Sequence, residues 1–114
     1  EVGVGIFEMK TMDEVLQHDE ARAWLEGEKE YMDFPEGETN DGFIERVSRG
    51  LEVLKSDVKH SNVIGVFHGA VIFTCMEMMF PSVKEKAWHW TPNPASGYAV
   101  TFEDGKPARY SEIG

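Results

Sequence analysis

The sequence predicts an α/β fold, and three segments lead to this prediction. Residues 63–67 (VIGVF) read as a strand that is apolar on both faces, and residues 70–80 follow as a helix that is apolar nearly all round. Residues 43–58 carry one apolar stripe at helical spacing. A strand buried on both faces needs helices on both sides. We therefore expect part of a three-layer α/β/α sandwich with a mostly parallel sheet.

The N-terminal part of the chain carries local signals for two elements. Residues 1–8 contain β-branched residues and two glycines, which favours a short strand or an extended segment with a close backbone approach. Thr11 and Glu14 have the spacing of a capping box, so we expect a helix from there to about Leu25, with Gly27 as its stop. The charged residues that follow, 28–39, form a loop because they include proline and glycine.

A second helix begins at Thr39, Asn40 or Asp41, each of which is a candidate N-cap. Its apolar stripe recurs at steps of three and four residues: Phe43, Val47, Leu51, Leu54 and Val58. Glu45 and Arg49 form an ion pair on its other side.

The C-terminal third predicts a β-hairpin. Residues 59–62 are a turn, Pro81 ends the apolar helix, and residues 84–90 are amphipathic. Two strand-like runs, 97–103 and 106–112, flank Asp104-Gly105, a dipeptide typical of hairpin turns. Pro107 places the second run at a sheet edge.

Composition indicates one small acidic domain, residues 1–114, without repeats or linkers. The formal net charge is −10, which argues against nucleic acid or an anionic membrane surface as a partner. The single cysteine, Cys75, lies in an apolar run and is expected to be buried and inert, which fits a cytoplasmic location. No signal peptide and no membrane span is visible.

His68 is the strongest candidate for chemistry. It stands where the predicted strand meets the predicted helix, and ligands of α/β proteins bind at such junctions. Gly69 permits the tight turn, and Ala70 follows in the first helical turn, where free N–H groups and the helix dipole favour an anion. We predict a phosphate site formed by His68, Gly69 and Ala70. The alternative is a histidine that only caps the helix or satisfies a core hydrogen bond.

The remaining candidates are weaker. His18 and His60 are expected at the surface, and His89 in packing or at the surface. No set of residues has the spacing of metal ligands, so we predict no metal and no other cofactor. The chain has no phosphate-binding G-x-x-x-x-G-K-[ST] loop and no G-x-S-x-G motif. Core packing is the expected role of the tryptophans, Trp24, Trp88 and Trp90.

Three stretches together resemble the histidine phosphatase superfamily, also called the phosphoglycerate mutase-like family. VIGVFHGAVI (63–72) is similar to the late strand that enters its second His-Gly pair. FPEGETNDGFIERV (34–47) is similar to its P-x-G-E-[ST] loop and the following helix with an arginine. EVGVGIFEMKTMDEV (1–15) is similar to its E-x-x-x-G-x-[WF]-E-G-x-T-x-x-E segment. Order and spacing also match, from Glu1 to about Phe102.

The resemblance implies roles for individual residues. His68 corresponds to the second active-site histidine, which holds the phosphoryl group and stabilises its charge. Glu1 corresponds to the general acid that protonates the leaving-group oxygen. Glu38 and Arg46 would position the walls of the site, and Glu8 would be structural. Two departures, Met9 in place of the usual glycine and Phe7 in place of a frequent tryptophan, affect the substrate and the local loop shape.

The family's R-H-G motif, which carries the nucleophilic histidine, is absent here, as is its S-P-x-x-R segment. Both would lie upstream of Glu1, so the resemblance implies that residues 1–114 are the C-terminal portion of a larger domain. The intact protein would be a metal-independent phosphatase or mutase that acts on a small phosphorylated compound through a phosphohistidine. The chain alone would be inactive, and its partner would be the upstream segment or a second copy. The alternative is a non-catalytic protein that binds a phosphorylated ligand or another protein.

Overall fold

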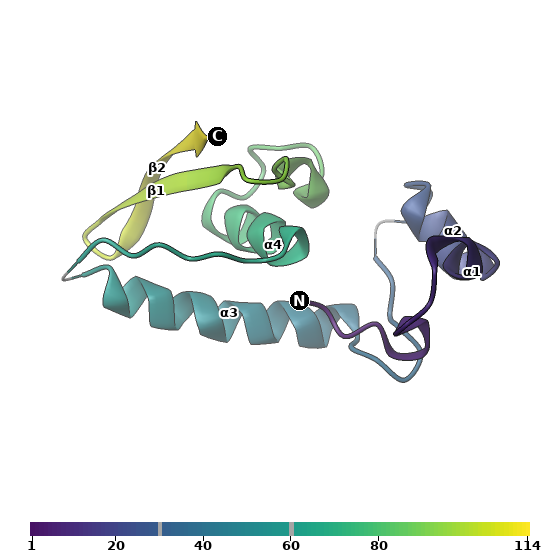
Figure 1. Ribbon diagram of the computed structural model, residues 1–114. Helices are drawn as coiled ribbons and strands as arrows, with labels where there is room; N and C mark the ends of the chain where they lie inside the picture. The colour runs from purple at the N-terminus through teal and green to yellow at the C-terminus, as the bar shows by residue number, and fades with distance from the viewer. Residues whose placement is uncertain (30, 60) are drawn as a thin grey trace. The chain divides into compact units, whose positions relative to one another are not determined.

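The computed structural model describes residues 1–29, 31–59 and 61–114, which form two compact units (Figure 1). One unit contains Glu1 together with residues 45–114, and the other contains residues 2–44. Helix α3 (Asn40–Asp57) contributes residues to both units. The single domain over residues 1–114 remains a prediction.

The larger unit is built around helix α4 (Gly69–Met79), a short 3-10 helix η2 (Ala87–Trp90) and two strands, β1 (Gly97–Glu103) and β2 (Lys106–Ile113). The predicted apolar helix over residues 70–80 and the predicted hairpin are therefore confirmed. In the described residues, β1 and β2 pair to form a two-stranded antiparallel sheet.

Trp90 is the centre of packing in this unit, because its side chain is completely buried. Its indole N–H donates to the Glu77 carboxylate at 3.0 Å, and its carbonyl accepts from the Tyr98 hydroxyl at 2.9 Å. The rings of Phe80, Tyr98 and Tyr110 surround it at centroid distances of 5.0 to 6.3 Å. The hairpin is thereby fixed to α4 through aromatic contacts and two hydrogen bonds.

The hairpin turn has the conformation that its sequence predicts. Asp104 and Gly105 both have positive φ, at 53° and 76°, as a two-residue type I′ turn requires. Phe102 pairs with Pro107 and Thr101 with Arg109, so the strand carries an irregularity next to the proline. Proline is tolerated at such a position because it cannot donate to the ladder.

Residues 63–67 differ from their prediction. The segment is extended but is not a strand of a sheet, and no backbone hydrogen bond joins residues 62–67 to any described residue. Ile64 and Val66 are each 93% exposed, whereas Val63 and Phe67 are 38% and 44% exposed. Alternate side chains are therefore open to solvent.

The predicted three-layer sandwich with a mostly parallel sheet is likewise not formed by the described part of the chain, which has a two-stranded antiparallel sheet instead. A parallel strand acquires its hydrogen bonds from neighbours supplied by other segments. Among the described residues no such neighbour lies beside residues 63–67.

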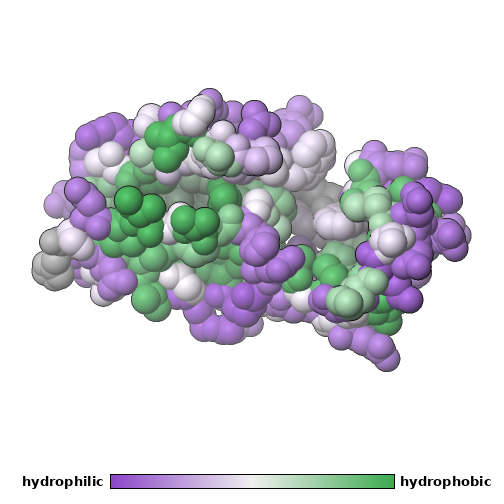
Figure 2. All heavy atoms as spheres, in the orientation of Figure 1, coloured by the Kyte–Doolittle hydropathy of each residue, from purple (hydrophilic) through white to green (hydrophobic). Residues whose placement is uncertain are grey.

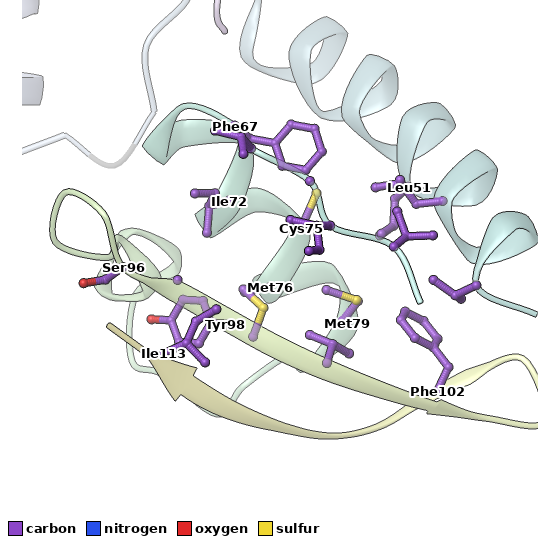
Figure 3. Close-up of a pocket in the computed structure, with 18 of the residues that line it drawn as sticks. Leu51, Phe67, Ile72, Cys75, Met76, Met79, Ser96, Tyr98, Phe102 and Ile113 are labelled. Atoms are coloured by element: carbon purple, nitrogen blue, oxygen red, sulfur yellow. The ribbon is translucent and has the colours of Figure 1, made fainter. Parts of the chain in front are cut away.

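An apolar groove runs between this extended segment and β1. It has a volume of about 510 Å³ and is lined by α3, residues 63–67, α4 and β1. Figure 2 shows apolar side chains gathered on this face of the unit. In Figure 3, Leu51 of α3, Cys75 and Met79 of α4, and Phe102 of β1 surround one space.

Helix α3 has the predicted start and the predicted apolar stripe. Thr39 is at the N-cap, since its hydroxyl accepts from the Gly42 N–H at 3.0 Å. Phe43, Val47 and Leu51 are buried, and the last two stripe residues, Leu54 and Val58, line the groove. The predicted pair of Glu45 and Arg49 forms at 2.7 Å.

The smaller unit contains a 3-10 helix η1 (Gly5–Phe7) and two short helices, α1 (Met12–Leu16) and α2 (Asp19–Leu25). Its core consists of Ala21, Met32 and Phe34, with five half-buried apolar residues packed on them: Val2, Val4, Phe7, Val15 and Trp24. The predicted capping box of Thr11 and Glu14 is present. Gly27 has the positive φ (79°) expected of a helix stop.

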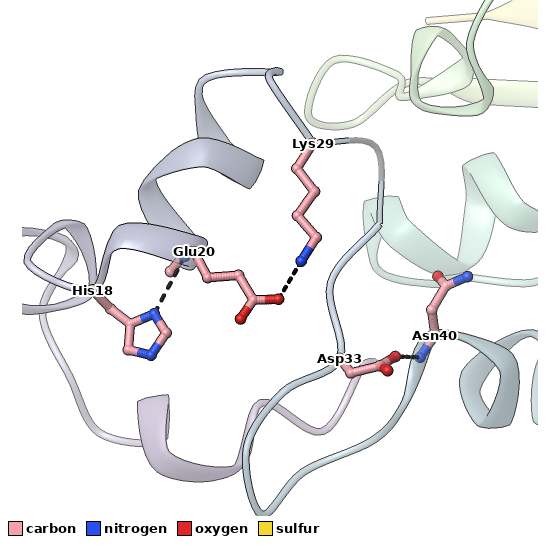
Figure 4. Close-up of polar contacts among 6 residues, drawn as sticks. His18, Glu20, Lys29, Asp33 and Asn40 are labelled. Carbon is pink, nitrogen blue, oxygen red and sulfur yellow. Dashed lines mark hydrogen bonds and ion pairs between the residues drawn. The ribbon is translucent and has the colours of Figure 1, made fainter.

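The single helix predicted up to Leu25 is interrupted before Asp19. Helix α1 ends at Leu16 with Gln17 as its C-cap. His18 is the N-cap of α2, because its Nδ1 accepts from the Ala21 N–H at 3.4 Å (Figure 4). Its ring is half-buried and meets Phe7 edge-on at 5.3 Å. His18, which was predicted at the surface, is therefore partly buried and caps a helix. The corresponding prediction for His60 lies outside the described residues.

Side-chain contacts hold the loop over residues 28–39. Lys29 forms an ion pair with Glu20, and the Asp33 carboxylate accepts from the Asn40 N–H at 2.8 Å (Figure 4). The predicted close approach in residues 1–8 also occurs here. Gly5 has a φ of +52°, and a Cβ at this position would lie 2.0 Å from the Pro35 carbonyl oxygen.

Candidate functional site

His68 lies at the N-cap of α4, at the end of the extended segment 63–67. Its backbone is extended, with φ −69° and ψ 154°, and its carbonyl accepts from the Val71 and Ile72 N–H groups at 3.0 and 3.1 Å. The side chain makes no capping hydrogen bond. The imidazole is 66% exposed, so its nitrogens are accessible to a ligand.

Gly69 and Ala70 are the first two residues of α4. Their N–H groups are among the four that a helix leaves without an intrahelical partner at this end. The positive end of the helix dipole lies here, next to the His68 ring. A phosphoryl oxygen could accept from these N–H groups while His68 contributes a further donor. Binding of phosphate by these residues remains a prediction.

Glu1 lies beside His68. One carboxylate oxygen of Glu1 is 3.5 Å from Nε2 of His68, an ion pair when the imidazole is protonated. The two residues are far apart in the sequence, yet they belong to the same compact unit. Both side chains are more than half exposed, at 69% for Glu1 and 66% for His68. The chain therefore brings together the two residues predicted to do chemistry.

Arg46 also contacts Glu1, although not through the carboxylate. Its guanidinium donates a hydrogen bond from Nη2 to the backbone carbonyl oxygen of Glu1, at 2.6 Å. The resemblance implied for Arg46 only a general place in the walls of the site. Arg46 lies beside the apolar stripe of α3, three residues after Phe43 and one before Val47, both of which are buried.

Glu38 and Glu8 have structural contacts within the smaller unit. One Glu38 carboxylate oxygen accepts from the Gly3 N–H at 2.8 Å, and the Glu38 N–H donates to the Gly3 carbonyl at 2.8 Å. Glu8 accepts from the Val4 N–H at 3.2 Å. These contacts order the backbone that follows Glu1 and the P-x-G-E-[ST] loop.

The other candidates lie apart from this cluster. His89 is exposed and stacks edge-on against Trp88 at 4.4 Å. Trp90 is a core residue as predicted, whereas Trp88 is 46% exposed. Cys75 is half-buried and not fully buried, because one side of it faces the groove. Burial raises the pKa of its thiol, which keeps it protonated near neutral pH.

A second perturbed group lines the same groove. Burial, followed by the negative charge of Glu112, raises the pKa of Tyr98. Within residues 1–29, 31–59 and 61–114, no three His, Cys, Asp or Glu side chains come close enough together to hold a metal ion. No helix in the described ranges is long and apolar enough to cross a membrane.

Comparison with known proteins identifies the family of this chain. A family model described as "Histidine phosphatase superfamily (branch 1)" matches residues 1–111, almost the entire sequence. No curated protein and no solved structure matches the chain significantly. The superfamily consists of phosphoryl-transfer proteins that are typically enzymes. Because the match spans more than half of the sequence, the chain belongs to branch 1 of the histidine phosphatase superfamily.

Proposed function

We propose that the intact protein is a metal-independent phosphatase or phosphoglycerate mutase-like enzyme that transfers the phosphoryl group of a small phosphorylated compound through a phosphohistidine. Residues 1–114 supply His68 and Glu1 to this site, and the R-H-G segment upstream supplies the nucleophile. The observation that carries the proposal is the 3.5 Å approach of the Glu1 carboxylate to the His68 ring at the N-terminus of α4.

Each residue has a defined task in this reaction. The nucleophilic histidine of the R-H-G segment forms a P–N bond as the P–O bond of the substrate breaks. Glu1 gives its proton to the departing oxygen, which assists most when that oxygen is strongly basic. His68 and the N–H groups of Gly69 and Ala70 stabilise charge on the phosphoryl oxygens. In the second step the attacking group is water in a phosphatase and the hydroxyl of an acceptor in a mutase. Its oxygen forms a new P–O bond as the P–N bond breaks, the histidine is released, and the Glu1 carboxylate takes the proton of the attacking oxygen.

Charge supports the need for a further segment. A phosphate monoester carries between one and two negative charges near neutral pH, and this chain has a net charge of −10. Among the described residues, the groups that can contribute positive charge at the site are His68, the N-terminal end of α4 and Arg46, which donates to the Glu1 carbonyl. Sites of phosphoryl transfer surround the equatorial oxygens with several strong donors. The arginine of an R-H-G segment would supply one of them.

We propose that this R-H-G strand occupies the groove between residues 63–67 and β1. Both walls present extended backbone, and in the described residues neither the extended segment nor the outer edge of β1 has a backbone partner there. A single apolar strand would pair with both walls and cover the apolar floor. The occupant could come from the same protein or from a second copy, and we favour the same protein, because it would end beside His68.

The test is to label the full-length protein with a radiolabelled phosphate monoester such as phosphoglycerate and to quench it in alkaline denaturant, because a phosphohistidine is stable in base and is lost in acid. We expect an acid-labile phosphoenzyme that decays at the rate of turnover. Turnover without such an intermediate would contradict the phosphohistidine route.

The alternative is a protein that binds a phosphorylated ligand without turning it over. The coding sequence upstream of Glu1 separates the two functions, because only an enzyme requires an in-frame strand that ends in R-H-G. A phosphate-binding protein without this motif would bind inorganic phosphate in a His68-dependent manner and show no labelling.

A further inference from the structure

Arg46 projects from a part of α3 that is held firmly in place. Phe43 and Val47, its neighbours in the helix, are 5% and 6% exposed, and α3 spans 18 residues. The 2.6 Å hydrogen bond from its guanidinium to the Glu1 carbonyl is charge-assisted, a class of hydrogen bond roughly twice as strong as a neutral one. Arg46 therefore ties the backbone of Glu1 to a rigid element.

The Glu1 carboxylate needs such an anchor. With 69% of its side chain exposed, Glu1 is not held by surrounding packing. In the part of the chain that the structure describes, the polar contact of its carboxylate is with His68 alone. Packing restricts such an exposed side chain little, so the position of its carboxylate depends on where its own backbone is held.

The atom that Arg46 contacts matters for the chemistry. An arginine paired directly with a carboxylate favours the ionised form and makes that group a poorer proton donor. Arg46 binds the backbone carbonyl of Glu1 instead, and the carboxylate points to His68. The contact can thus fix the position of Glu1 while its carboxylate stays directed toward His68.

We infer that Arg46 is a positioning residue for the general acid: it holds the main chain of Glu1 so that the carboxylate lies beside His68 and can deliver a proton to the leaving oxygen. This inference rests on the proposed function. It also goes further, because it assigns to one arginine of α3 a defined effect on one proton-transfer step.

The chain offers a matched control. Arg49 lies on the same helix three residues later and pairs at 2.7 Å with Glu45, with both side chains well exposed at 67% and 73%. Such surface pairs contribute little to stability. Arg46→Met and Arg49→Met each remove one guanidinium from α3 and keep an unbranched stem, and Arg46→Lys retains the charge without the planar fork.

The experiment measures kcat of the full-length protein on an alkyl phosphate, such as glycerol phosphate, and on p-nitrophenyl phosphate, whose leaving oxygen needs no proton. A displacement of about 1 Å can cost on the order of a hundredfold in rate. We therefore expect Arg46→Met to lower kcat on the alkyl phosphate by about ten- to a hundredfold and to affect the aryl phosphate little. Arg46→Lys should recover part of the loss, and Arg49→Met should behave as wild type.

A double variant tests whether Arg46 acts through Glu1. In a Glu1→Gln background no proton can be delivered, so adding Arg46→Met should lower kcat on the alkyl phosphate little further. Equal losses on both substrates, a full further loss in the Glu1→Gln background, or identical behaviour of Arg46→Met and Arg49→Met would each overturn the inference. Wild-type protein that turns over neither ester and forms no phosphoenzyme would instead overturn the proposed function and this inference with it.

Discussion

At the scale of single residues, His68 combines exposure with a helix terminus in a way that a purely structural histidine does not. Its main chain caps α4, but its ring makes no capping hydrogen bond and is 66% exposed. The structural alternative predicted a ring that satisfies a cap or a core group. The ring contacts the Glu1 carboxylate instead, so its removal from the chain should affect chemistry more than stability.

His68→Ala in the full-length protein should lower kcat by about 10²–10³-fold, the usual cost of removing one preorganised donor at a developing charge. The melting temperature should change little, because the ring is exposed and its backbone role is retained. His89→Ala is the control, since His89 is also exposed but lies in η2. A large loss of stability with normal turnover per folded molecule would make His68 structural.

His18 shows why the local sequence predicted one helix where there are two. Histidine is not among the usual N-cap residues, so the apolar pattern suggested continuity across it. In the structure its Nδ1 accepts from the Ala21 N–H, and Ala21 is 1% exposed in the core of the smaller unit. This cap depends on a lone pair that a neutral imidazole has and an imidazolium lacks.

We expect His18→Ala to destabilise the protein by about 0.5–2 kcal/mol, the typical cost of losing an N-cap side chain. His18→Asn should restore most of this stability, because asparagine is among the best N-caps. Urea unfolding measured by circular dichroism would report the difference. If the alanine and asparagine variants unfolded at the same urea concentration, His18 would stabilise the protein through its packing against Phe7 and not through the helix cap.

At the scale of elements, the structure confirms predictions that depend on neighbours in the sequence. The capping box at Thr11, the type I′ turn at Asp104-Gly105 and the stripe of α3 need only residues within a turn or two. Residues 63–67 also have the apolar character that was expected of them, but a strand requires a partner from elsewhere. The site also combines a local prediction with a distant one. The sequence alone placed His68 at the start of a helix, whereas the role of Glu1 beside it came from the resemblance.

The rate at which the Cys75 thiol is alkylated depends on its burial beside the groove. Its pKa is raised by burial, so the thiolate forms only at higher pH than in an unfolded chain. Alkylation of residues 1–114 by iodoacetamide should therefore accelerate at more alkaline pH than alkylation of the same chain in urea. Because the pKa of the thiol is higher in the folded chain than in the unfolded chain, its contribution to the free energy of unfolding is fully present below the unfolded pKa. That contribution is lost as the pH rises through the folded pKa.

In the full-length protein the rate of Cys75 alkylation should be lower still, because a strand in the groove would cover Cys75. Mass spectrometry of the alkylated peptide measures the rate in each sample. An equal rate in residues 1–114 and in the full-length protein would mean that the groove stays open, which contradicts the proposed occupant.

At the scale of the whole chain, the two units differ in how well their apolar residues are covered. The smaller unit encloses its own core around Ala21, Met32 and Phe34. The larger one buries Trp90 completely but leaves Ile64 and Val66 almost fully exposed next to an apolar groove. An extended segment with free backbone groups and exposed apolar side chains pairs readily with another chain.

Residues 1–114 purified alone should consequently associate or precipitate, and they should be rescued by the upstream segment of the same protein. Replacing Ile64 and Val66 by lysine should lower light scattering of the isolated chain without changing its melting, because neither side chain has packing to lose. Val53→Lys is the matched control, since Val53 lies on α3, is 62% exposed and does not line the groove. In the full-length protein the same two lysines should be strongly destabilising, because there the segment would be an inner strand with both faces covered. Two results together would show that residues 63–67 need no partner. The isolated chain would be a soluble monomer that melts cooperatively, and the two lysines would leave the stability of the full-length protein unchanged.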